Sequence, residues 1–224
     1  APSDYRWGYN RMTTIQGLFA AGDGVGAAPH KFSSGSFTEG KIAAKAAVTY
    51  LRDIGDTPRV SDEMVQLYES AIWKPTETFQ KHRGASTSEE INPHYILPKQ
   101  GLVRLQKIMD EYAGGITAQY TTSEPLLNRG LELIAMFRED REHLGARDQH
   151  ELLRCWELDH RAWVAESHMR HLLHRKETRW PGYYYRSDYP NLDDDNWRVF
   201  VNSTYDSDTG RWDLFTKPYH QLIA

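Results

Sequence analysis

Gly17-Leu-Phe-Ala-Ala-Gly-Asp-Gly-Val-Gly-Ala-Ala-Pro-His-Lys-Phe-Ser-Ser-Gly-Ser36 is the stretch of this 224-residue chain that decides the fold. Its first five residues form an apolar run, which predicts a buried strand that ends where a glycine lets the backbone turn. Asp23 follows at the carboxyl end of that strand, the edge at which open α/β sheets bind ligands. Ser36-Phe-Thr-Glu39 matches a capping box, so we expect a helix to open there with free amides suited to an anion or a polar ring edge. This order of residues indicates a cofactor-binding turn.

The helix that opens there is expected to extend from about Phe37 to Asp53. Its small and apolar face consists of Ile42, Ala43, Ala46, Ala47 and Tyr50. Small residues let a helix pack closely on a sheet. One strand and one helix do not bury both of their faces, so we interpret residues 1–55 as the C-terminal part of a larger α/β domain. The glycine and proline of the segment Gly55 to Arg59 then mark a domain boundary.

Residues 56–177 carry the pattern of long amphipathic helices and are interpreted as a helical domain. Ser61 is suited to cap the first helix, which we expect to end at Pro75. Further helices are expected from Pro98 to Gly114, from Ser123 to Leu144 and from about Asp148 through Leu173. Four helices of this kind predict a small bundle.

Residues 178–224 are rich in aromatic side chains and turn signals. Arg198 to Thr204 and Arg211 to Lys217 alternate as strands around a polar turn, which predicts a β-hairpin. The seven Trp and 13 Tyr residues of the chain concentrate toward this end, so we expect the segment to contact a partner subunit. The expected fold class is therefore α+β: a strand-turn-helix, then a helical bundle, then an aromatic hairpin segment.

Composition narrows the function classes. A formal net charge of -4 argues against nucleic-acid binding, and no apolar run is long enough to span a membrane. The single cysteine, Cys155, excludes an internal disulfide and an iron-sulfur cluster held by this chain alone. We find no signal peptide at the N-terminus, and we expect a reducing, cytoplasmic location.

Two blocks of sequence carry a family resemblance. The first comprises Gly17-Leu-Phe-Ala-Ala-Gly-Asp23, Pro29-His-Lys-Phe-Ser-Ser-Gly-Ser36 and Glu39-Gly-Lys-Ile-Ala-Ala-Lys-Ala46, and the second runs from Arg175 to Trp197. Both resemble the fumarate reductase and succinate dehydrogenase flavoprotein superfamily, and within it the family of alpha (flavoprotein) subunits of dissimilatory adenylylsulfate reductases. The resemblance extends over essentially the whole chain.

The resemblance implies an FAD enzyme that interconverts adenosine 5'-phosphosulfate with AMP and sulfite through a flavin-sulfite adduct. Electrons would come from a beta subunit that holds the iron-sulfur clusters. Gly22 and Asp23 would approach the ribityl and pyrophosphate groups, and Ser33 to Ser36 would lie against the isoalloxazine ring. The residues that the resemblance places at FAD are Gly22, Asp23, His30, Lys31, Phe32, Ser33, Ser34, Gly35 and Ser36.

Two departures from the superfamily pattern matter. Fumarate and succinate enzymes carry an arginine where this chain has His30-Lys-Phe-Ser-Ser34, and a lysine lacks the fork that grips a carboxylate with two hydrogen bonds. A dicarboxylate substrate is therefore disfavoured. The Gly-x-Gly-x-x-Gly turn that opens an FAD domain is also missing. The FAD site in this chain is thus expected to be incomplete, with the catalytic residues upstream of Ala1.

The alternatives are a fumarate reductase-type flavoprotein and a fragment that only binds a partner. Smaller features also have two interpretations. His160, His168, His171 and His174 share one helix, yet no cysteine or carboxylate completes a metal site, so we expect none. Asp193-Asp-Asp195 is either a cation loop or, as we favour, a solvated turn. Arg175, Lys176 and Arg179 form either a solvated helix end or an anion-binding patch.

Overall fold

The computed structural model describes residues 7–25, 32–55, 59–179 and 183–219. Its internal contacts divide the chain into two compact units, Ala1–Val65 and Gln66–Ala224. The boundaries expected from the sequence, after residues 55 and 177, stay predictions about domain organisation.

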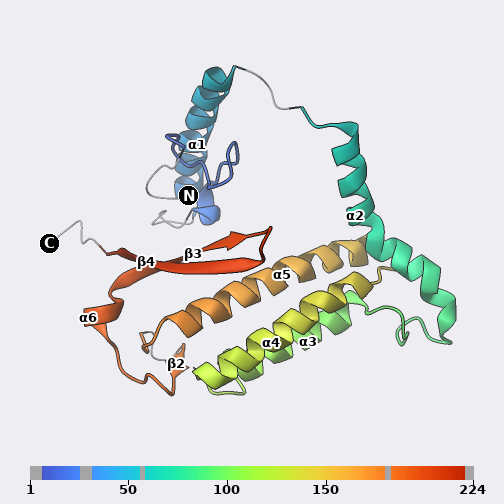
Figure 1. Ribbon diagram of the computed structural model, residues 1–224. Helices are drawn as coiled ribbons and strands as arrows, with labels where there is room; N and C mark the ends of the chain where they lie inside the picture. The colour runs from blue at the N-terminus through green and yellow to red at the C-terminus, as the bar shows by residue number, and fades with distance from the viewer. Residues whose placement is uncertain (1–6, 26–31, 56–58, 180–182, 220–224) are drawn as a thin grey trace. The chain divides into compact units, whose positions relative to one another are not determined.

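The first unit is built on helix α1 (Ser33–Ile54) and the segment that precedes it (Figure 1). The helix begins three residues before Ser36, and Gly55 ends it in the left-handed conformation, at φ 67°. The predicted face is the covered one: Ala43 is buried, and the ring of Tyr50 lies 5.2 Å from that of Tyr9 and 6.1 Å from that of Phe19.

The strand expected over Gly17 to Ala21 is wrong. Only Phe19 pairs, in an isolated antiparallel bridge with Met12, and the chain between them turns back on itself. The amide of Thr13 donates to the carbonyl of Leu18 at 2.8 Å, and Gly17 has a φ of 83°. A strand requires neighbours for its backbone hydrogen bonds, and among the described residues none lies alongside this run beyond that bridge.

The second unit is built on three helices, α3 (Pro98–Tyr112), α4 (Glu124–Asp140) and α5 (Gln149–His174), which lie side by side in Figure 1. Apolar residues that all three supply form the main core. Its buried members on these helices are Leu105, Ile108, Leu127, Ile134, Phe137, Leu152, Cys155, Leu158, Ala162, Ala165 and Met169. The expected starts of α3 and α5 are confirmed; the side chain of Asp148 caps α5 by accepting from the amide of Glu151 at 2.8 Å. Helix α4 ends earlier than expected, in the 3-10 turn η3 (Arg141–His143).

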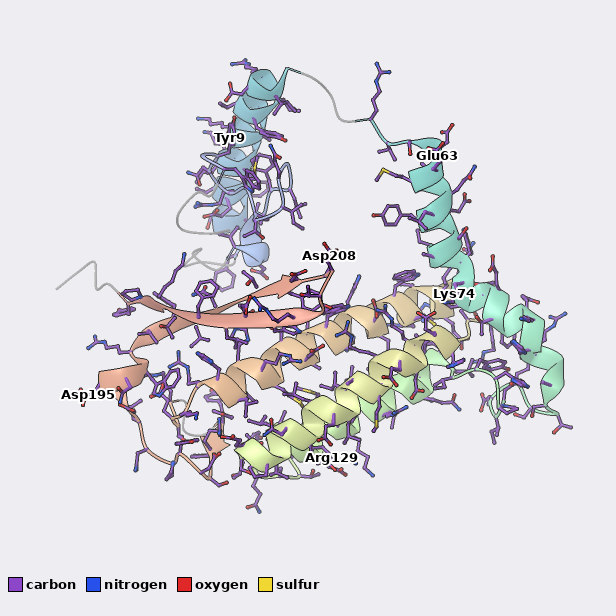
Figure 2. The ribbon with its side chains drawn as sticks, viewed as in Figure 1. Tyr9, Glu63, Lys74, Arg129, Asp195 and Asp208 are labelled. Carbon is purple, nitrogen blue, oxygen red and sulfur yellow. The ribbon has the colours of Figure 1, made fainter. Side chains whose placement is uncertain are left out.

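Helix α2 (Asp62–His82) departs from the sequence expectation in two ways. It does not end at Pro75 but continues through it, and Figure 2 shows the helix changing direction near Lys74. Proline cannot donate to the preceding turn, so a bend is the expected result. The carbonyl of Pro75 accepts from the amide of Ala146 at 3.0 Å, which fixes the bend to the loop before α5.

The fourth helix of the predicted bundle is also absent from the main core. In the second unit α2 packs by Phe79 on Tyr95 and Leu97, a small separate cluster. Trp156 on α5 donates to the carbonyl of Ile72 at 3.3 Å. The bundle therefore has three helices, and α2 meets it only near one end.

Two small sheets complete the second unit. Strand β1 (Thr121–Thr122) pairs in parallel with β2 (Tyr185–Arg186). After the short helix α6 (Asp194–Trp197), strands β3 (Val199–Asp206) and β4 (Arg211–Pro218) form the predicted antiparallel hairpin, in a register from Val199↔Pro218 to Asp206↔Arg211. Tyr205 and Trp212 pack the hairpin on α5, with the Tyr205 ring 4.6 Å from that of Trp163. The α+β class is confirmed.

In the part of the chain that the structure describes, every helix is too short or too polar to cross a membrane.

Gly130 on α4 provides a test of the bundle. A Cβ at this position would lie 2.8 Å from both Met169 Cε and Tyr112 Cβ, where α3, α4 and α5 meet. We expect Gly130→Ala to lower the free energy of unfolding by about 1–3 kcal/mol through overpacking. Urea unfolding followed by circular dichroism measures it. Gly40→Ala on α1 is the matched control, because a Cβ there meets nothing within 4 Å and should stabilise its own unit by about 0.5–1 kcal/mol. Equal effects of the two substitutions would contradict the packing.

Candidate functional site

The segment before α1 forms a loop that leads directly into the predicted cofactor turn. The amide of Ala20 donates to the carbonyl of Arg11 at 2.9 Å, which closes the loop just before the 3-10 turn η1 (Gly22–Gly24). Met12 and Val25 are buried on either side of that turn. The loop is therefore held by both backbone pairing and apolar burial.

Gly22 needs to be glycine for two reasons. Its φ is 63°, a value that side chains disfavour, and a Cβ would lie 3.2 Å from Ser36 Oγ. The turn thus presses against the first turn of α1. Asp23 is exposed beside it, and a carboxylate in this position can accept hydrogen bonds from a ligand's hydroxyl groups.

The start of α1 differs from the predicted capping box. Phe32 occupies the cap position in extended conformation, it supplies no side-chain cap, and no acidic residue lies in the first turn. The amide of Ser36 already donates to the carbonyl of Phe32 at 2.9 Å, so Ser36 is inside the helix rather than before it. The amides of Ser33, Ser34 and Gly35 precede that first helical bond, and the Phe32 side chain caps none of them. Such an end favours an anion or an electron-rich ring edge.

The structure brings together most of the residues that the sequence assigns to the cofactor. Gly22, Asp23 and the run from Phe32 to Ser36 all belong to η1 and the beginning of α1, two elements in contact. Phe32 exposes 77% of its surface and Phe37 exposes 80%. His30 and Lys31 lie outside the described residues.

Sequence reasoning missed an ion pair beside this site. Arg11 donates from Nε and Nη2 to the two carboxylate oxygens of Glu39, the second bond at 3.0 Å. Glu39 is buried, and the Arg11 guanidinium holds the pKa of its carboxyl below the ordinary value. Arg11 itself has a φ of 67°, a strained conformation that costs about 1–3 kcal/mol in a residue other than glycine. The capping-box interpretation assigned Glu39 to the helix end, although a carboxylate on the covered face of a helix signals a need for a cation.

Arg175 and Arg179 form neither a solvated helix end nor an open anion patch, whereas Lys176 between them in the sequence is exposed. Glu177 is fully buried and accepts from Arg175 Nη1 at 2.5 Å, from Arg179 Nε at 2.6 Å and from the amide of Asp193 at 3.0 Å. Burial alone would raise the pKa of the Glu177 carboxyl, but these donors outweigh it and the pKa is lowered. Both arginines are therefore committed to structure.

The histidines of α5, Cys155 and the Asp193 turn have contacts that indicate structural roles. The His171 ring is within 2.8 Å of the Ser167 carbonyl, and the His174 ring packs edge-on to Trp197. Within residues 7–25, 32–55, 59–179 and 183–219, no group of three His, Cys, Asp or Glu side chains is arranged to hold a metal ion. Burial raises the pKa of the Cys155 thiol to about 12, so it stays protonated. Asp193 caps α6 by accepting from the amide of Asn196 at 3.1 Å.

Comparison with known proteins shows which family the chain resembles. The fumarate reductase flavoprotein C-terminal family matches residues 103–222. The adenylylsulfate reductase alpha subunit of Megalodesulfovibrio gigas is 47% identical over 215 residues, 96% of this chain and 32% of that protein.

Solved structures agree with that comparison. An adenosine-5-phosphosulfate reductase in complex with sulfite, as a covalent adduct, has a TM-score of 0.91 and 57% identity over 96% of this chain and 34% of its own. The adenylylsulfate reductase of Archaeoglobus fulgidus has a TM-score of 0.93 and 54% identity over 100% of this chain and 36% of its own. The chain spans about a third of the length of these relatives.

Removing the Glu177 carboxylate tests its structural role. In Glu177→Gln, two guanidinium groups lose their anionic partner in a buried setting, and we expect the free energy of unfolding to fall by about 3–5 kcal/mol. Urea unfolding measures the loss. Glu132→Gln is the matched control, because its pair with Arg129 (Figure 2) is exposed and should contribute at most about 1 kcal/mol. A Glu177 variant as stable as the Glu132 variant would contradict the assignment.

The same carboxylate predicts a pH dependence. Arg186 lowers the pKa of Asp188 as the donors above lower that of Glu177, so both folded-state values lie below the unfolded ones. Their stabilisation is then complete above about pH 4.3 and is lost as the pH falls through the folded values. Urea midpoints at several pH values between about 7 and 3 should fall steeply at the acid end and less steeply in Glu177→Gln. Parallel pH profiles would show that Glu177 is not titrating in this way.

Proposed function

We propose, because the chain belongs to the fumarate reductase flavoprotein C-terminal family, that it forms the C-terminal part of the flavoprotein subunit of an adenylylsulfate reductase. The activity is the interconversion of adenosine 5'-phosphosulfate with AMP and sulfite. The observation that carries this proposal is the 47% identity to an adenylylsulfate reductase alpha subunit over 96% of the chain. Two solved structures of that enzyme share the fold with 54% and 57% identity.

The residues present fit an FAD group. Phe32 supplies no cap to the start of α1, the first turn of α1 holds no acidic residue, and η1 packs closely against it through Gly22 and Ser36. Phe32 and Phe37 expose their rings at the same end of α1, which suits an aromatic cofactor more than water. A helix end of this kind is matched to a group that carries negative charge.

Each part of the site has a role in this proposal. Asp23 would accept hydrogen bonds from cofactor hydroxyl groups, and the amides of Ser33, Ser34 and Gly35 would orient the ring and stabilise negative charge on it. FAD supplies the electron-transfer chemistry when it is bound. The chain itself binds, orients and excludes water, and the residues that act on the sulfur group would come from elsewhere in the subunit.

The sequence between His30 and Ser34 supports a sulfoxy substrate over a dicarboxylate. Lys31 offers a compact positive charge. It lacks the planar fork by which arginine binds both oxygens of a carboxylate. A fumarate reductase activity is accordingly the weaker alternative.

The partner would be an iron-sulfur beta subunit in the cytoplasm, and the aromatic segment 178–224 would contact it. Phe200, Phe215 and Tyr219 of this segment are exposed by 40% or more. Exposed aromatic residues are enriched in protein interfaces. The single cysteine agrees with clusters held by the partner rather than by this chain.

A purified complete subunit that contains this chain should be yellow. We expect a visible absorption band near about 450 nm from bound flavin, and FAD should be released on denaturation. Addition of sulfite should bleach the band, because the substrate class is a sulfoxy group, whereas succinate, the electron donor of the alternative reaction, should leave it unchanged.

Two results would contradict the proposal. A colourless, stably folded subunit would support the function of a partner-binding module instead. A band that is bleached by succinate but not by sulfite would favour the dicarboxylate alternative.

A further inference from the structure

Arg11 connects the cofactor turn to the helix that opens beside it. Its carbonyl accepts from the amide of Ala20, two residues before Gly22. Its side chain grips Glu39 on α1 with two hydrogen bonds from the guanidinium group. One residue thus fixes both the end of the loop and the helix.

The geometry of this connection is strained and enclosed. Only 17% of the Arg11 side chain and 9% of the Glu39 side chain are exposed. Arg11 keeps a φ of 67°, in the left-handed region that residues other than glycine rarely adopt. Strained backbone of this kind persists where surrounding contacts enforce it, and it concentrates at functional sites.

The ion pair and the cofactor turn act on the same part of α1. Glu39 lies three residues after Ser36, so the two side chains are on neighbouring turns of one helix face. Ser36 is the residue against which Gly22 packs, and Glu39 is the residue that Arg11 grips. Two contacts, one from each end of the loop, therefore set the position of Gly22 and Asp23 relative to the first turn of α1.

We propose that Arg11 and Glu39 are the positioning pair of the flavin site, which hold the turn Gly22–Gly24 in register with the start of α1. This inference rests on the proposed function. Neither residue needs to touch the cofactor. The pair keeps the hydroxyl-binding carboxylate of Asp23 and the amides of Ser33 to Gly35 at a fixed separation, as a ligand with two recognised ends requires.

The chain offers a matched control at the other end of the same helix. Tyr9 Oη donates to Asp53 Oδ2 at 2.8 Å, and Figure 2 shows Tyr9 beside α1. Tyr9→Phe removes a tie between the same loop segment and the same helix, but far along α1 from Ser36. If the loop contributed only to stability, Tyr9→Phe and Arg11→Lys would change FAD binding and the flavin spectrum to the same extent.

The experiment uses the complete subunit with Arg11→Lys, Glu39→Gln or Tyr9→Phe. Lysine keeps the charge and loses the fork, and glutamine keeps the shape and loses the charge. We expect both to weaken FAD binding at least about tenfold, which corresponds to about 1.4 kcal/mol. We also expect both to change the visible circular dichroism of the remaining bound flavin, while Tyr9→Phe leaves that spectrum as in the wild type.

The outcomes separate the two proposals. Wild-type subunit without flavin would refute the proposed function itself. Flavin-loaded wild type together with unchanged affinity and spectrum in Arg11→Lys and Glu39→Gln would overturn the positioning pair alone, as would a Tyr9→Phe spectrum altered to the same extent. If Arg11→Lys does not fold, the isosteric Glu39→Gln decides, and hydrogen exchange at the amides of Ala20 and Val25 reports whether the turn has loosened.

Discussion

The second unit depends on a carboxylate that is surrounded by donors. Glu177 follows the end of α5 and is fully buried, so its charge is tolerated only because Arg175, Arg179 and the amide of Asp193 all donate to it. Arg175 also donates to the carbonyls of Trp197 and Val199, at 2.7 and 2.8 Å. A single buried charge therefore joins the end of α5 to the turn before α6 and to the first residue of the hairpin.

A second buried charge extends this arrangement to α4. Arg186 is fully buried and donates to both oxygens of Asp188 at 2.7 Å and to the Arg175 carbonyl at 3.1 Å. Asp188 in turn accepts from the amide of Glu124, the first residue of α4, at 2.8 Å. The carbonyl groups of irregular segments lack the regular hydrogen bonds of a helix or sheet. A guanidinium group, with five N–H donors, can supply hydrogen bonds to several of them. The first unit uses the same device, because Arg11 and Glu39 hold an irregular loop on α1.

The sequence predicted those features of the fold that depend on interactions between residues close together in the chain. The helix starts at Pro98 and Asp148 and the hairpin around Gly210 were predictable, because caps, proline positions and strand alternation act within a few residues. Pro75 was misjudged because the loop before α5 fixes the bend from a distant part of the chain. The turn at Gly22 was predictable from its glycines, and its contact with a cofactor stays a prediction. The ion pair by which Arg11 supports this turn was not predictable, because Arg11 and its partner Glu39 are 28 residues apart and no periodicity of the sequence relates them.

The apolar and polar features of the first unit point to the same incomplete environment. One face of α1 packs on the loop through Ala43 and Tyr50, but Val48 and Leu51 are exposed by 49% and 57%. A helix that is apolar on more than one side belongs in a core with cover on each of them. At its N-terminus, Phe32 caps none of the first amides, and the rings of Phe32 and Phe37 are exposed beside them. In the proposed function, a sheet would cover the apolar face of α1 and a flat, negatively charged ring system would lie against the amides at its start, so one flavoprotein domain would meet both needs.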